Sequence, residues 1–113
     1  MTNASALLLV EQDLIDTVTL TPQCAALFED VLGRNVSDCL LTDLSTLSDF
    51  TGSGMPADPA NDVLDYRDYC RAWDRWVLDR IEQVFGVRIE RTTLTFIQIV
   101  ERLTQAQLVP TLN

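Results

Sequence analysis

The chain has 113 residues, of which 47% are hydrophobic, and its formal net charge is −9. This length suits one domain over residues 1–113, and the hydrophobic content is too high for a disordered chain. The negative charge repels phosphate backbones, so we expect no direct binding to nucleic acid.

Residues 1–20 are predicted to form an N-terminal extension or an extra helix. Their apolar spacing suits a helix over about 5–16, with residues 17–20 extended. The apolar run at 6–10 lacks a preceding positive region and a cleavage signal, so it is not typical of a signal peptide. It is also shorter than the roughly 20 residues that span a bilayer. We therefore expect no membrane interaction and a cytoplasmic protein.

The next predicted helix covers residues 22–32. Thr21 can cap it, Pro22 suits its first position and Gly33 ends it. Its apolar residues fall on one face: Cys24, Leu27, Phe28, Val31 and Leu32. A polar connection follows over residues 35–50, in which Ser45 is expected to cap a short turn over residues 47–50.

Residues 51–61 contain two glycines and two prolines, which predicts a loop. Asp62 or Asp65 then opens the longest helix, which ends at Phe85 before a glycine stop. After a briefly extended piece at 87–89, Thr92 or Thr93 is expected to cap a last helix, with a fraying tail after residue 105. The buried stripe of that helix is predicted to be Phe96, Ile97, Val100 and Leu103. The predicted fold class is all-α, a small bundle of three to four helices.

Few residues favour catalysis or metal binding. The chain has no histidine, so acid–base chemistry at neutral pH would need a perturbed carboxylate or cysteine. Cys24, Cys39 and Cys70 lack the close spacing of a zinc site and are expected to be buried free thiols. We predict no metal site and no enzyme activity.

The acidic residues and the aromatic group supply the candidates for protein binding. Residues 1–65 hold eleven acidic side chains and one basic one, Arg34. Tyr66, Tyr69 and Trp73 share a helical face and are expected in the core, whereas Trp76, near Arg75 and Arg80, is expected to be partly exposed. Tryptophan and arginine are enriched at interface hot spots. The candidate interaction residues are Trp76, Asp43, Asp49, Asp58 and Asp62.

Four short patterns over residues 22–103 resemble parts of a known family. They are Leu27-Phe28-Glu29-Asp30-Val31-Leu32-Gly33, the acidic stretch at 41–50, the helix end Ile81-Glu82-Gln83-Val84-Phe85-Gly86-Val87, and Ile99-Val100-Glu101-Arg102-Leu103. In this order they resemble the acyl carrier proteins, which implies a carrier-like topology. A carrier attaches phosphopantetheine to the serine of an Asp-Ser-Leu motif. The nearest match here, Asp62-Val63-Leu64, has valine in the place of that serine. Ser53 is the only serine in the 51–61 loop and would carry the cofactor.

We therefore predict a small acidic protein that has no catalytic activity and no cofactor and binds another protein, with a basic partner favoured by the charge. The pattern also resembles that of small acidic bacterial proteins of unknown function. Two alternatives stay open. One is an acyl or peptidyl carrier with phosphopantetheine on Ser53, and the other is an immunity or antitoxin-type inhibitor of a basic toxin.

Overall fold

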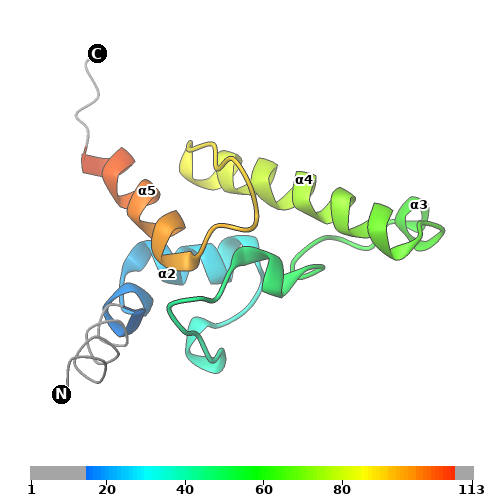
Figure 1. The fold of residues 1–113 in the computed structure, drawn as a ribbon. Helices are drawn as coiled ribbons and strands as arrows, with labels where there is room; N and C mark the ends of the chain where they lie inside the picture. Colours follow the sequence, from blue (N-terminus) through cyan, green and yellow to red (C-terminus); the bar gives the residue numbers. More distant parts are fainter. Residues whose placement is uncertain (1–14, 109–113) are drawn as a thin grey trace, which may run out of the picture.

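The computed structural model describes residues 15–108, and most of these residues are helical (Figure 1). Helical residues 15–19 precede α2 (Pro22–Ala26), the π-helix η1 (Leu27–Val31), the 3-10 helices η2 (Val36–Asp38) and η3 (Leu47–Phe50), α3 (Pro59–Asp62), α4 (Tyr66–Phe85) and α5 (Phe96–Leu108). Extended pairing within the described part of the chain is limited to one isolated antiparallel bridge, between Thr46 and Thr95. The predicted all-α class is confirmed.

The extended piece predicted at 17–20 is wrong, because residues 17–19 are helical. Threonine hydroxyls bond back to nearby helix carbonyls: Thr19 donates to Asp16 O at 2.8 Å, and Thr21 donates to Val18 O at 2.7 Å. A threonine in a helix can bond a carbonyl one turn earlier in this way, whereas Thr21 is extended and caps α2. The rest of the helix predicted at 5–16, and the tail beyond residue 108, lie outside the described residues.

The helix predicted at 22–32 begins as expected and then widens. Thr21 accepts from Cys24 N at 3.2 Å, and Pro22 takes the first turn. From Leu27 the chain forms a π turn, in which Leu32 N donates to Leu27 O at 3.1 Å. Residues 27, 28, 31 and 32 are all buried. The wide π turn brings apolar residues that are four and five positions apart to the same side of the helix.

The short turn predicted at 47–50 is η3, but its cap is not Ser45. Thr46 precedes the helix, and its N–H donates to Asp49 Oδ2 at 2.9 Å in a capping box. The hydroxyl of Ser45 instead accepts from Thr42 N at 2.9 Å. Ser45 lies one residue before the cap position, and its hydroxyl closes the turn that precedes η3.

The loop predicted over residues 51–61 ends early, because α3 begins at Pro59. Asp58 accepts from Ala60 N at 3.0 Å, and Pro59 occupies the first helical position. An aspartate followed by proline is a favourable helix start. The loop over residues 54–58 and this short helix together form one wall of a groove beside α4.

The long helix α4 begins and ends at predicted residues. Asp65 accepts from Asp68 N at 2.9 Å, and Gly86, with a φ of 70°, ends the helix. Trp73 is fully buried, as predicted, but Tyr66 is 78% exposed. The prediction for Tyr66 fails because a helix of 20 residues is about 30 Å long and outruns the core. The start of α4 projects with α3 beyond α2 and α5 (Figure 1).

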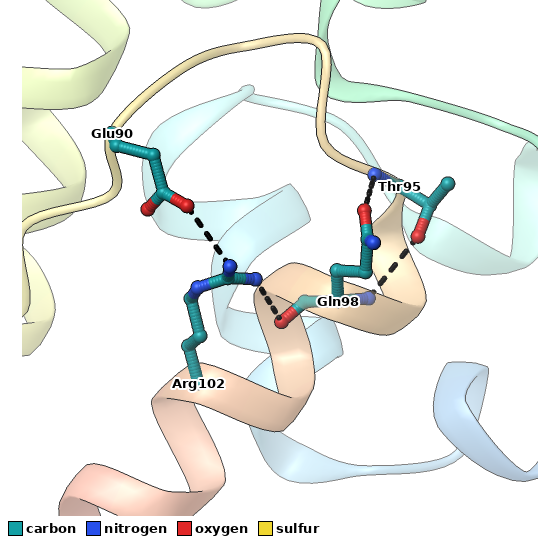
Figure 2. Close-up of polar contacts among 4 residues, drawn as sticks. All are labelled: Glu90, Thr95, Gln98 and Arg102. Carbon is teal, nitrogen blue, oxygen red and sulfur yellow. Dashed lines mark hydrogen bonds and ion pairs between the residues drawn. The ribbon is translucent and has the colours of Figure 1, made fainter.

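The last helix, α5, is capped by Thr95, so the predicted capping by Thr92 or Thr93 is wrong. Figure 2 shows Thr95 and Gln98 facing each other: Gln98 N donates to Thr95 Oγ1 at 3.2 Å, and Thr95 N donates to Gln98 Oε1 at 3.0 Å. The middle of α5 is tied to the preceding loop by an ion pair of 2.9 Å between Arg102 and Glu90. The predicted fraying after residue 105, apart from residues 108 and 109, is wrong for residues 106 and 107, which belong to α5.

Thr92 has a different role, because its buried hydroxyl donates to Asp74 Oδ1 on α4 at 3.1 Å. The carbonyl of Thr92 accepts from Ser48 N at 2.9 Å. Thr92 is thus bonded to two other segments and does not cap α5, and Thr95 is the capping residue.

Three phenylalanine rings bring the helical segments together at the core. Phe28 of η1, Phe50 of η3 and Phe96 of α5 have centroid separations of 5.0–5.5 Å. Trp73 and Ile81 of α4 are fully buried and belong to the same core. Of the predicted α5 stripe, Phe96, Val100 and Leu103 are buried and Ile97 is half-buried, while Ile99 is buried in addition.

Candidate interaction surface

Trp76 faces a groove that runs along one side of α4. Ala72, Trp76, Arg80 and Gln83 are spaced four, four and three residues apart, so they lie on one face of the helix. Two hollows, of about 300 and 350 Å³, adjoin there and share Trp76 and Pro56. We call this pair of hollows the Trp76 groove. Its opposite wall is formed by Glu29, Asp30, Val31, Gly33 and the segment 54–61.

The loop that forms this wall is fastened to the two helices beside it. Trp73 Nε1 donates to Ser53 O at 3.0 Å, which ties the loop to α4. Gly54 has a φ of 80°, and a Cβ at this position would overlap the carbonyl oxygen of Val31. Only glycine permits both this conformation and so close an approach. Further along, Asn61 Nδ2 lies 4.0 Å from Met55 Sδ, as a weak donor to sulfur.

The two walls carry charges of opposite sign. Glu29, Asp30 and Asp58 lie on the loop side, whereas Arg75 and Arg80 lie on α4. Arg80 Nε donates to the backbone carbonyl of Asp30 at 3.3 Å, so this guanidinium reaches across the groove.

Arg75 does not form an ion pair with Asp79, which lies four residues further along α4. Asp79 is bound by Arg88 at 2.7 Å instead. Arg75 therefore has no ion-pair partner within residues 15–108, and its exposed guanidinium remains available at the edge of the second hollow. Asp68 and Arg71, also on α4, form an ion pair of 3.9 Å on the surface.

Only two of the five predicted interaction residues meet. Trp76 is half-buried, as expected, and it shares the second hollow with Asp58. Asp62 is exposed at the end of α3 and does not line the groove. Asp43 and Asp49 lie on the connection between η1 and α3, where Asp49 already accepts from Thr46 N.

Ser53 is held by three hydrogen bonds. Its hydroxyl accepts from Arg34 Nε at 3.0 Å, its N–H donates to Phe50 O at 2.9 Å, and its carbonyl accepts from Trp73. The Arg34 guanidinium also lies over the Phe50 ring, 5.6 Å from the centroid. The structure therefore places Ser53 in a fixed turn beside the only arginine of the first 65 residues.

The three cysteines are free thiols, but only Cys24 is fully buried, while Cys39 and Cys70 are half-buried. Burial raises the pKa of Cys24 to about 11, with a smaller contribution from Cys39. Within residues 15–108, no cluster of cysteine and carboxylate side chains is arranged to hold a metal ion. No helix in this range is both long enough and apolar enough to cross a membrane.

The sequence did not indicate Met55, Pro56 and Asn61 as walls of the groove, because a loop with glycines and prolines has no hydrophobic period. The helical spacing of Ala72, Trp76, Arg80 and Gln83 was the available signal for the α4 wall. In comparisons with protein families, curated proteins and solved structures, nothing matches this chain.

Proposed function

We propose that this small acidic protein acts without catalysis, by binding another protein through the Trp76 groove. The observation that carries the proposal is a half-buried tryptophan between two hollows, with the arginine Arg75 unpaired within the described residues. Tryptophan and arginine side chains contribute most to binding energy when a partner desolvates them. A bound partner would cover Trp76 and give Arg75 a counter-ion or a carbonyl acceptor.

The residues of the groove support binding rather than catalysis. None of the described residues that line it carries a hydroxyl, a thiol or an imidazole group. Nucleophilic catalysis by a serine, threonine or cysteine therefore has no candidate there. The groove offers an aromatic ring, short apolar side chains and exposed charges, which are the components of a protein interface.

A basic partner in the cytoplasm fits the charge and the thiols. The net charge of −9 favours rapid encounter with a positively charged protein. Free cysteines suit a reducing compartment. An immunity or antitoxin-type inhibitor of a basic toxin is one protein of this kind, and it would use the same groove.

The second candidate function is an acyl or peptidyl carrier with a carrier-like topology. The position of Arg34 supports it, because its Nε is 3.0 Å from the Ser53 hydroxyl. A phosphodiester formed at that hydroxyl would meet a guanidinium, which is a strong partner for phosphate. Treatment with a phosphopantetheinyl transferase and measurement of the intact mass test it. The carrier function requires an added arm that is absent from a Ser53→Ala variant.

The binding function is tested by capture of partners from the native host with three immobilised proteins. The wild type is compared with Trp76→Ala and with the control Tyr66→Ala, which removes an exposed aromatic side chain from the projecting start of the same helix. We expect a partner that the wild type and Tyr66→Ala retain and that Trp76→Ala loses. Equal recovery by all three proteins would contradict the use of the Trp76 groove.

A further inference from the structure

Another hollow lies apart from the two hollows of the Trp76 groove and shares no lining residue with them. It measures about 390 Å³ and lies between residues 16–20 and residues 36–41, two segments on the same side of α2 and η1 (Figure 1). We call it the Leu40 hollow. Its lining residues are Asp16, Thr19, Leu20, Val36, Ser37, Cys39, Leu40 and Leu41.

Among residues 15–106, the three most exposed leucines lie at or beside this hollow. Leu40 is 100% exposed, Leu20 is 85% exposed, and Leu44, in the turn that follows, is 75% exposed. By contrast, Leu27 and Leu47 are completely buried. Contiguous exposed apolar side chains with a polar rim mark interaction sites.

The backbone on both sides of Leu40 keeps it in this outward position. Before it, Asn35 accepts from Ser37 N at 3.1 Å and starts η2. After it, Thr42 organises a turn: its carbonyl accepts from Ser45 N at 3.1 Å, and its hydroxyl accepts from Leu44 N at 3.2 Å.

Three neighbours of Leu40, namely Val36, Cys39 and Leu41, pack against the core. Leu40 therefore cannot turn inward without breaking these contacts, so the apolar surface exists before any partner arrives. Binding to such a preorganised surface loses little conformational entropy.

The charge around the Leu40 hollow has one sign. Asp16 lines it, and Asp38 and Asp43 flank the exposed leucines in sequence. Among residues 15–65 the only basic side chain is Arg34, which is bonded to Ser53. A second copy of the chain would bring acid against acid here, and an anionic membrane would be repelled. A basic partner complements this rim.

The described residues also contain no exposed strand that could pair with a peptide, since their extended pairing is the single Thr46–Thr95 bridge. An apolar hollow of this kind can accept an amphipathic helix, which is one of the recurring modes of peptide recognition. We propose that the Leu40 hollow is a docking site for a basic amphipathic helix of a partner protein. Apolar residues of that helix contact Leu20 and Leu40, and its lysines or arginines lie beside Asp38 and Asp43. The site is distinct from the Trp76 groove, and its test does not depend on that groove.

The test uses a synthetic helix of about 14 residues with leucines at i, i+3, i+4 and i+7 and lysines elsewhere. Calorimetry gives its affinity for the full-length protein, and amide shifts in isotope-labelled protein locate it. Leu40→Asn is compared with Val63→Asn, a matched change at an aliphatic residue that is 84% exposed directly after α3. We expect shifts at residues 16–20 and 36–44, with the affinity unchanged in Val63→Asn and about tenfold weaker in Leu40→Asn. Asp43→Asn is expected to weaken binding and to reduce its salt dependence.

Several results would overturn the proposal. The first is equal affinity for the wild type and Leu40→Asn, or no binding of the lysine peptide to either. The second is equal affinity for a peptide with glutamate in place of lysine. Shifts confined to the Trp76 groove would assign the peptide to that surface instead. Self-association that Leu40→Asn abolishes, measured by sedimentation, would assign the hollow to a second copy, and vesicle binding that Leu40→Asn abolishes would assign it to lipid.

Discussion

Replacement of Gly54 by alanine probes the close contact that forms the Trp76 groove. Gly54 has a φ of 80°, and alanine in the left-handed region costs about 1–2 kcal/mol. The new Cβ would also overlap the carbonyl oxygen of Val31 and lie 3.0–3.1 Å from backbone atoms of Leu32. These are backbone atoms that cannot rotate away, so the loop has to shift. Such overpacking costs a further 1–3 kcal/mol, approximately. We expect Gly54→Ala to lower the free energy of unfolding by about 3 kcal/mol.

Gly86→Ala separates the steric cost from the backbone cost. Gly86 has a φ of 70°, but no atom lies within 4 Å of its Cβ position. This variant should therefore show only the backbone cost of about 1–2 kcal/mol. The effect of alanine on the unfolded chain is the same in both variants and cancels in the comparison. Urea unfolding followed by circular dichroism measures both values. If the two variants agree within about 0.5 kcal/mol, the close contact between the loop and η1 does not exist in solution.

Two further predictions concern a helix start and a thiol. Thr95→Ala should lower the free energy of unfolding by about 1 kcal/mol because it removes the cap of α5, whereas Thr93→Ala, at an exposed position, should have little effect. The same urea titration measures both, and equal losses would contradict the assignment of Thr95. Burial raises the pKa of Cys24 from 9.0 to about 11, so folding favours the protonated thiol; this stabilisation is complete below pH 9 and is lost as the pH rises towards 11. The stability difference between the wild type and Cys24→Ala should fall across that range, and a constant difference would contradict the raised pKa.

Where a few adjacent residues decide a boundary, the sequence was sufficient to predict it. Thr21 followed by Pro22 starts a helix at the expected place, and α4 is bounded by Asp65, one of its two predicted starts, and by Gly86. These signals work because a side chain or a glycine satisfies backbone groups within one turn of itself. The partial exposure of Trp76 also followed from helical spacing alone.

Features that depend on distant contacts could not be predicted in this way. Thr92, Thr93 and Thr95 are equivalent as local caps, and the choice depends on the bond of Thr92 to Asp74 in another helix. Tyr66 has the periodicity of a core residue, but its exposure depends on where the neighbouring helices end. The walls of the groove at Met55 and Pro56 depend on how the loop is fastened to Trp73, since that bond links residues 20 positions apart.

The two tryptophans of α4 give the protein built-in optical reporters of two different events. Trp73 is fully buried, with its indole N–H bonded to Ser53, so its emission should be blue-shifted and protected from iodide until the chain unfolds. Trp76, three residues later, is half-buried at the groove and should be accessible to the quencher. A ligand in the groove would therefore shield Trp76 and leave Trp73 unchanged. Quenching experiments on the native protein can thus distinguish occupancy of the surface from loss of the fold, without any added label.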